Sequence, residues 1–228
     1  MRRVDGFRHP LWVRLTHWIG ASAFLALAVS GFAILLALPR LFWGETGAND
    51  APAWIVLPLP VNLEQTGWGR NLHFLAAWIF VLSGAVYALA AILSGHLFRR
   101  LAPDRDQLRP DNLARELRDH LHIRPPTPVS GGERYNALQK FAYLAVLLVL
   151  APVMLLSGLT MSPGVTAAYP ELFTLFGGRQ SARTIHFLAA SLLVAFLVVH
   201  LWQVVANRPL RLLRGMITGR SGGKTEKA

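Results

Sequence analysis

Four long runs of apolar residues alternate with polar segments along the chain. They cover about Trp18–Leu38, Leu72–Leu93, Phe141–Met161 and Ile185–Ala206, and none contains Lys, Arg, Asp or Glu. A helix that crosses the hydrocarbon core of a bilayer needs about 20 apolar residues. The pattern therefore predicts an all-α fold, an integral membrane four-helix bundle. The simplest domain organisation is a single domain over residues 1–228.

The first apolar run could also be the core of a secretory signal peptide. That core is usually about 7–15 residues long, whereas this run has about 20. No small-x-small cleavage site follows it before Pro39 and Arg40. We therefore expect the run to be retained as the first membrane helix.

The polar connections contain shorter patterns. The loop Pro39–Gly69 carries three Trp residues and several Pro residues, which favours a structured cap at the membrane interface. In the connection at about 95–140, the segment PDNLARELRDHLH places Leu113, Leu117 and Leu121 four residues apart. This spacing predicts a short amphipathic helix.

Basic residues are distributed unevenly. Nineteen Lys and Arg residues lie in the N-terminal arm, the 95–140 connection and the C-terminal tail, and only four lie in the other two connections. Cytoplasmic loops carry the excess of Lys and Arg. We therefore expect both termini and the central connection in the cytoplasm, with the chain in a bacterial inner membrane. The net charge of +11 then reflects topology and does not indicate nucleic-acid binding.

The sequence contains no cysteine and eight histidines. Disulfides, thiolate-held iron–sulfur clusters, thioether-attached haem and cysteine zinc sites are excluded together. A resident metal or cofactor would therefore depend on histidine.

Four of the histidines match in membrane depth. His17 and His200 lie near the inner ends of the first and fourth spans, and His73 and His186 lie near the outer ends of the second and fourth. His186 and His200 are fourteen residues apart, which puts them on nearly the same helix face, roughly 21 Å apart along the axis. An imidazole on each side of a porphyrin saturates haem iron and suits it to electron transfer. The pairs His17–His200 and His73–His186 therefore predict axial ligands for the iron of two haem b groups.

The alternative is that each histidine is an interfacial or packed residue, which is common for a lone His near a helix end. Two depth-matched pairs favour ligation. For the remaining four we expect surface or interfacial roles: His9, His96, His120 and His122.

Three arginines each precede a histidine of these pairs by three residues: Arg14, Arg70 and Arg183. Residues at this spacing share a helix face, and a guanidinium pairs well with a carboxylate. We expect contacts to haem propionates, with interfacial snorkelling as the alternative. Gly31 shares the face of His17 and would let either a macrocycle or a neighbouring helix approach closely.

The segments RLTHW, NLHF, ERYNALQKFAY and IHF through VVHLW carry a resemblance to the bacterial cytochrome b561 and nickel-hydrogenase b-type cytochromes. Within that group the chain is similar to the four-helix cytochrome b (gamma) subunits of thiosulfate reductase and formate dehydrogenase. HPLWVRLTHW and FGGRQSAR are similar to the thiosulfate reductase type. The resemblance implies two haem b groups, a quinone site at Asn136 beside the inner haem, and a periplasmic partner subunit of the molybdopterin-dependent kind. Tyr135 and Lys140 are further quinone candidates, because they lie beside Asn136 at the inner start of the third span. The alternative is that Asn136 only caps this helix, since Asn is a favoured N-cap residue.

Together these features predict an electron-transfer subunit between the quinone pool and a periplasmic oxidoreductase, itself not the catalytic subunit. One alternative is a free-standing diheme quinol oxidoreductase that acts on a small oxidant such as superoxide. Another is a haem-free membrane anchor or transport subunit. The partner, its substrate, the direction of electron flow and the quinone type are not encoded in recognisable motifs.

Overall fold

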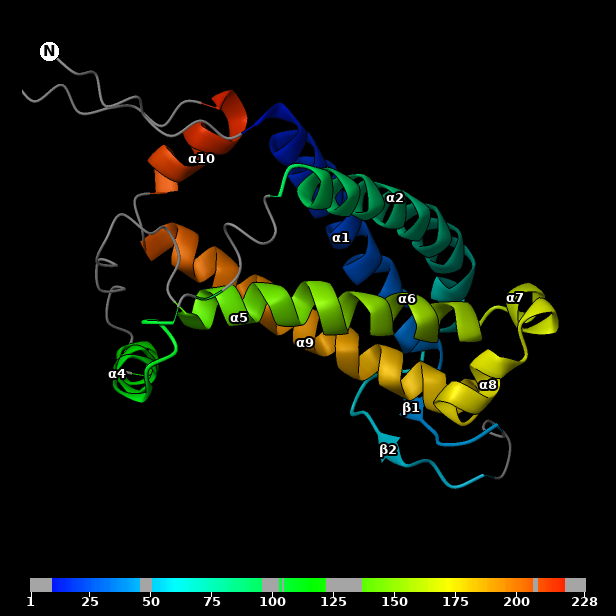
Figure 1. Ribbon diagram of the computed structural model, residues 1–228. Coiled ribbons are helices and arrows are strands. Elements are labelled where there is room, and N and C mark those ends of the chain that lie inside the picture. The colour runs from blue at the N-terminus through cyan, green and yellow to red at the C-terminus, as the bar shows by residue number, and fades with distance from the viewer. Residues whose placement is uncertain are drawn as a thin grey trace, which may run out of the picture. The chain divides into compact units, whose positions relative to one another are not determined.

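The computed structural model describes residues 10–45, 51–95, 103, 105–121, 137–206 and 209–219 (Figure 1). In these ranges four helical segments are long and apolar enough to cross a membrane. They are α1 (Leu11–Ala37), α2 (Thr66–Leu93) with the preceding 3-10 turn η1 (Leu63–Gln65), the continuous run of α5 (Ala137–Ala145), π-turn η2 (Val146–Leu150) and α6 (Ala151–Thr160), and α9 (Arg179–Ala206). The predicted all-α membrane fold is confirmed.

The surfaces of these helices are apolar. Leu25, Leu82 and Val198 are 56%, 62% and 62% exposed, and many other large apolar side chains resemble them. Exposure of this surface to water would be unfavourable, because the transfer of apolar surface out of water lowers the free energy. A lipid environment removes that cost, so the exposed surface fits a membrane protein.

The described residues form two compact units. The first draws on residues 1–21, 82–143 and 197–228, and the second is made of residues 22–81 and 144–196. Each of the four spans therefore contributes one part to each unit. His17 and His200 belong to the first unit, and His73 and His186 belong to the second.

In the second unit the loop after α1 forms a small hairpin. Strands β1 (Arg40–Leu41) and β2 (Ile55–Val56) pair antiparallel, with Arg40 opposite Val56. The adjoining Phe42 is buried, and its carbonyl oxygen accepts a hydrogen bond of 2.7 Å from the hydroxyl of Thr184 in α9. The hairpin is thus attached to the first turns of α9. This agrees with the predicted structured cap.

Gly44 attaches the same loop to α9 about one turn closer to the start of that helix. The carbonyl oxygen of Gly44 accepts hydrogen bonds from the backbone N–H groups of Gln180 and Ser181, and the Gly44 N–H donates to Ser181 Oγ at 2.7 Å. These bonds satisfy donors that the start of a helix leaves free. Gly178 has φ +110°, and a Cβ there would lie 2.5 Å from the carbonyl carbon of Gly44. Only glycine fits this position.

Two short helices, α7 (Pro163–Ala168) and α8 (Glu171–Phe176), connect α6 to α9. Helix α8 ends at Gly177 in the left-handed conformation, with φ +67°. A glycine at this position closes a helix without steric cost.

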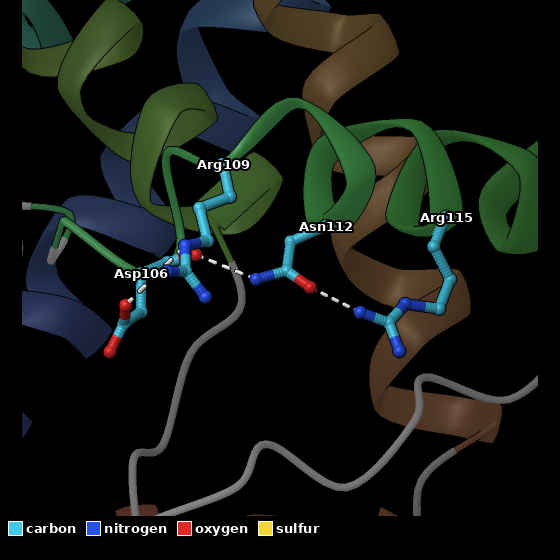
Figure 2. Close-up of polar contacts among 4 residues, drawn as sticks. All are labelled: Asp106, Arg109, Asn112 and Arg115. Carbon is cyan, nitrogen blue, oxygen red and sulfur yellow. Dashed lines mark hydrogen bonds and ion pairs between the residues drawn. The ribbon is translucent and has the colours of Figure 1, made fainter.

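In the first unit the predicted amphipathic helix is α4 (Pro110–Leu121). Figure 2 shows its start, where the Asn112 amide donates to the Asp106 carbonyl at 2.6 Å and Arg115 donates to Asn112 Oδ1. Arg109 Nε lies 3.8 Å from the Asp106 carboxylate. These exposed contacts hold the turn before α4 but contribute little stability, because water screens surface ion pairs.

The middle of α4 contacts a membrane span. The Glu116 carboxylate accepts hydrogen bonds from the backbone N–H groups of Ala137 and Leu138, at 3.4 and 3.1 Å. It therefore caps the N-terminus of α5, where a negative charge is favourable. The last described helix, α10 (Pro209–Thr218), is joined to α1 by a hydrogen bond from Trp18 Nε1 to the Met216 carbonyl at 3.2 Å.

Candidate functional site: two histidine pairs

The second unit brings His73 of α2 and His186 of α9 together. Their ring centroids are 6.3 Å apart and the ring planes make an angle of 62°. Both side chains are partly buried. They come from residues 113 positions apart in the sequence, so only the packing of two spans places them in contact.

The first unit brings His17 of α1 and His200 of α9 together in a similar way. Their centroids are 6.5 Å apart, with 53° between the planes. The Trp18 ring meets His17 edge-on at 5.2 Å. The structure therefore forms the same two pairs that the sequence predicts.

These separations can be compared with what a shared metal ion requires. A histidine nitrogen binds zinc at about 2.0–2.1 Å, and it lies roughly 1.1 Å from the centre of its ring, so two rings on opposite sides of one metal ion have centroids roughly 6.2–6.4 Å apart. The two observed distances match this value to within a few tenths of an ångström. Both pairs therefore fit one metal ion between their rings.

The rest of the coordination must come from elsewhere. Among the described residues, His, Asp and Glu side chains form no group of three or more that could hold a metal ion. A macrocycle that supplies its own ring nitrogens completes such a site, as in haem with two histidine ligands. The residues present fit haem better than a protein-only metal centre.

Two serines lie behind the rings of the second unit. Ser30 Oγ in α1 is 3.0 Å from His73 Nδ1, and Ser157 Oγ in α6 is 3.0 Å from His186 Nδ1. The sequence did not predict a role for either residue. Each is followed by glycine, but Ser83 and Gly84 form the same pair in α2, so the pair alone does not distinguish them.

The glycines that follow make room for the same rings. A Cβ on Gly31 would lie 3.4 Å from His73 Cε1, and a Cβ on Gly158 would lie 3.4 Å from His186 Cε1. The sequence suggested that Gly31 makes room for a macrocycle or for a neighbouring helix. In the structure the group that lies against Gly31 is the imidazole of His73.

Each of the three arginines expected at the propionates has a different environment. Arg183 donates hydrogen bonds to the carbonyl oxygens of Leu38 at 2.6 Å and Arg40 at 3.1 Å. Arg14 has a buried Nε with no hydrogen-bond partner among the described residues, which leaves a donor available to a carboxylate. Arg70 is exposed at the start of α2.

Arg179 is a further arginine, for which the sequence predicted no role. Its Nε is buried and has no hydrogen-bond partner in the described part of the chain, and its guanidinium carbon lies 5.4 Å from the centre of the Phe173 ring. It precedes His186 by seven residues in α9 and therefore shares that face of the helix. The spacing i, i+7 in RQSARTIH was the available signal.

The expected quinone residues are only partly described. Asn136 and Tyr135 lie outside the described residues, as do His9, His96 and His122 and the side chain of His120. Lys140 is buried in α5. One residue before it, the Gln139 amide donates a hydrogen bond of 3.3 Å to Gln203 Oε1, three positions after His200 in α9. The start of α5 is thus joined to the part of α9 that carries His200.

Comparison with known proteins agrees with this arrangement. The family model described as prokaryotic cytochrome b561 matches residues 8–219. The chain belongs to this family. Membership implies haem b as the cofactor and places the chain in the bacterial inner membrane as a multi-pass protein.

Two curated relatives cover most of this cytochrome b561-family chain. One from Azospira oryzae, named "Putative protein-methionine-sulfoxide reductase subunit YedZ1", is 33% identical over 92% of the chain and 96% of its own length. One from Cupriavidus necator, named "Probable Ni/Fe-hydrogenase B-type cytochrome subunit", is 28% identical over 85% of the chain and 76% of its own length. No solved structure matches the chain.

Proposed function

We propose that the chain is a diheme cytochrome b subunit that transfers electrons between the quinone pool and a periplasmic oxidoreductase. The observation that carries the proposal is the pair of ring separations, 6.5 Å for His17–His200 and 6.3 Å for His73–His186. Membership of the cytochrome b561 family supports haem as the group between the rings.

The four histidines would be the axial ligands, one pair for each haem. Haem b with two imidazole ligands supplies one-electron transfer and leaves no open position for a substrate. The side chains hold the ring nitrogens at two places along α9, so this helix contributes to both sites. The rings of His73 and His186 are partly buried, which would limit reorganisation when the charge of their site changes.

The propionates would be held by arginine. Arg14 supports this role in the inner site, since its Nε is buried without a partner. For the outer site, Arg70 remains a candidate from the sequence, and Arg179 is supported by its own unpaired Nε. Arg183 already donates to two backbone carbonyls, which favours a structural role.

The quinone site would lie at the cytoplasmic side, with Asn136 as a hydrogen-bond donor to a quinone oxygen. Support comes from its described neighbours, because Glu116, Lys140 and Gln139 gather at the start of α5 and Gln139 reaches α9 near His200. The Gln139 amide could help to orient a quinone head group, and the partly exposed Glu116 carboxylate could exchange protons with cytoplasmic water. The orientation rests on the distribution of Lys and Arg.

The partner would be a separate periplasmic redox subunit. Both relatives are named as subunits of redox enzymes, which favours this over a free-standing oxidoreductase that acts on superoxide. The name of the Azospira relative makes a sulfoxide reductase one candidate. The resemblance to thiosulfate reductase subunits implies a molybdenum-containing partner.

The haem content of the purified protein tests the proposal. We expect two haem b groups per chain by pyridine haemochrome analysis and one in each of the variants His17→Ala, His73→Ala, His186→Ala and His200→Ala. His96→Ala, outside both pairs, is the control and should keep two. A wild-type chain without haem, or a histidine-pair variant with two haems, would contradict the ligand assignment.

The quinone site is tested with Asn136→Ala in isolated membranes. We expect slower reduction of both haems by a quinol analogue, while reduction by dithionite is unchanged. Normal quinol-dependent reduction with unchanged inhibitor binding would place the quinone elsewhere. Co-purification of a periplasmic redox subunit with the full chain tests the partner, and its absence would favour the free-standing alternative.

A further inference from the structure

The hydroxyl groups of Ser30 and Ser157 are buried in matching positions. Both side chains are fully buried, at 0% exposure. Each lies 3.0 Å from the Nδ1 atom of a histidine on a different helix, His73 for Ser30 and His186 for Ser157. A serine hydroxyl inside an apolar span must be hydrogen-bonded, because a buried hydroxyl without a partner is destabilising.

The donors and acceptors at each serine can be assigned. The Ser30 hydroxyl donates its proton to the Ala26 carbonyl at 2.6 Å, and the Ser157 hydroxyl donates to the Val153 carbonyl at 2.5 Å. A hydroxyl carries one proton and two acceptor positions. With the proton directed to the carbonyl, the oxygen is left as an acceptor for the histidine.

The imidazoles must then carry their proton on Nδ1. In a neutral imidazole one nitrogen donates and the other accepts. Nε2 is then the nitrogen with a free lone pair.

From this geometry we propose that Ser30 and Ser157 are a matched pair of positioning residues for the outer haem. Each accepts a hydrogen bond from Nδ1–H of one axial histidine, which fixes its tautomer and directs Nε2 to the iron. The inference rests on the proposed haem ligation. It deepens that proposal by assigning a redox-tuning role to two residues that touch neither iron nor substrate.

The following glycines make this contact possible. The ring of His73 lies over Gly31 and the ring of His186 over Gly158, each at 3.4 Å from where a Cβ would be. In each pair the serine therefore supplies a hydrogen-bond acceptor, and the glycine leaves room for a histidine ring from another helix. Because the arrangement occurs once for each ligand, both axial bonds of the outer haem are supported alike.

The hydrogen bond has a measurable effect on the haem. Donation from Nδ1–H makes the imidazole a more basic ligand, and a more basic ligand stabilises ferric relative to ferrous iron. Loss of the acceptor should therefore raise the midpoint potential of the outer haem. Loss of such supporting contacts also weakens metal binding by about 10- to 100-fold.

The test uses the full chain with Ser30→Ala, Ser157→Ala and the double variant. Ser30→Thr and Ser157→Thr keep the hydroxyl and are the conservative variants. The control is Ser191→Ala in α9, because Ser191 Oγ bonds the Phe187 carbonyl four residues earlier and is exposed. Readouts are redox titration of both haems, the low-spin ferric EPR signal, and the rate of haem loss to apomyoglobin. His73→Ala identifies which signals belong to the outer haem.

We expect each alanine variant to raise the outer potential, change the outer EPR signal and release the outer haem faster, with a larger effect in the double variant. The inner haem is the internal standard and should not change, and the threonine variants should restore the outer signals. Equal outer signals in Ser30→Ala, Ser157→Ala and Ser191→Ala would overturn the inference. So would parallel changes in both haems, because these would show a general packing defect. A wild-type chain that lacks haem would instead overturn the proposed function.

Discussion

The guanidinium of Arg183 donates a hydrogen bond of 2.6 Å to the carbonyl oxygen of Leu38, the residue that follows α1. A second bond of 3.1 Å goes to the Arg40 carbonyl in β1. The end of a helix leaves carbonyl groups without partners, and a cation there is favourable. Arg183 therefore attaches the end of α1 to α9.

This contact predicts that Arg183→Gln lowers the stability of the fold. Loss of charge-assisted bonds to two carbonyls should cost about 1–3 kcal/mol of unfolding free energy, measured by thermal or denaturant unfolding in detergent. The exposed Arg70, changed to Gln, is the matched control. Unchanged stability together with a lower outer haem potential would instead make Arg183 a propionate ligand.

Arg179→Gln tests the unpaired Nε in α9. A positive charge beside a haem stabilises the reduced form, which carries less positive charge at the iron. Its removal should lower the midpoint potential of the outer haem while haem stays bound, as a redox titration would show. Arg40→Gln, an exposed arginine of the hairpin, should leave the potential unchanged. An equal potential in both variants would remove Arg179 from the site.

Gly178→Ala should destabilise the attachment of the loop after α1 to the start of α9. The residue has φ +110°, and a Cβ would lie 2.5 Å from the Gly44 backbone. The backbone conformation alone costs about 1–3 kcal/mol for a residue other than glycine, and the steric overlap adds to it. The melting temperature should fall, whereas Gly164→Ala in α7, where a Cβ meets no heavy atom within 4 Å of the described structure, should be nearly neutral. A melting temperature equal to that of wild type would contradict the assigned contact.

Reporter fusions test the orientation. A fusion after residue 228 should be active with a cytoplasmic reporter and inactive with alkaline phosphatase, because Lys and Arg concentrate on that side. A fusion between residues 48 and 52 should show the reverse. Phosphatase activity from the C-terminal fusion would invert the topology and exchange the inner and outer sites.

The sequence predicts the four spans and the amphipathic helix because their signals are periodic or continuous. The helices begin earlier than the apolar runs, at Leu11 and Arg179 in place of Trp18 and Ile185. Hydrophobicity reports the part of a helix within lipid, whereas the first turns can contain arginine and threonine. The hairpin strands β1 and β2 have two residues each, too few for any alternating pattern.

The site residues also divide into those that the sequence predicts and those that it does not. The two histidine pairs follow from depth and spacing, since a charged or polar ring in an apolar run is conspicuous. Ser30 and Ser157 did not stand out, because a single serine that bonds its own helix is common and leaves no periodic signal. The bonds of Arg183 depend on where the loop after α1 lies, which only tertiary packing decides.

Helix α9 supplies one histidine to each pair and is the last of the four candidate spans in the described chain. On the proposed ligand set, neither site is complete before α9 is translated, because one site needs His186 and the other needs His200. Haem loading must therefore follow translation of the final span, and a chain that stalls before it offers only single ligands.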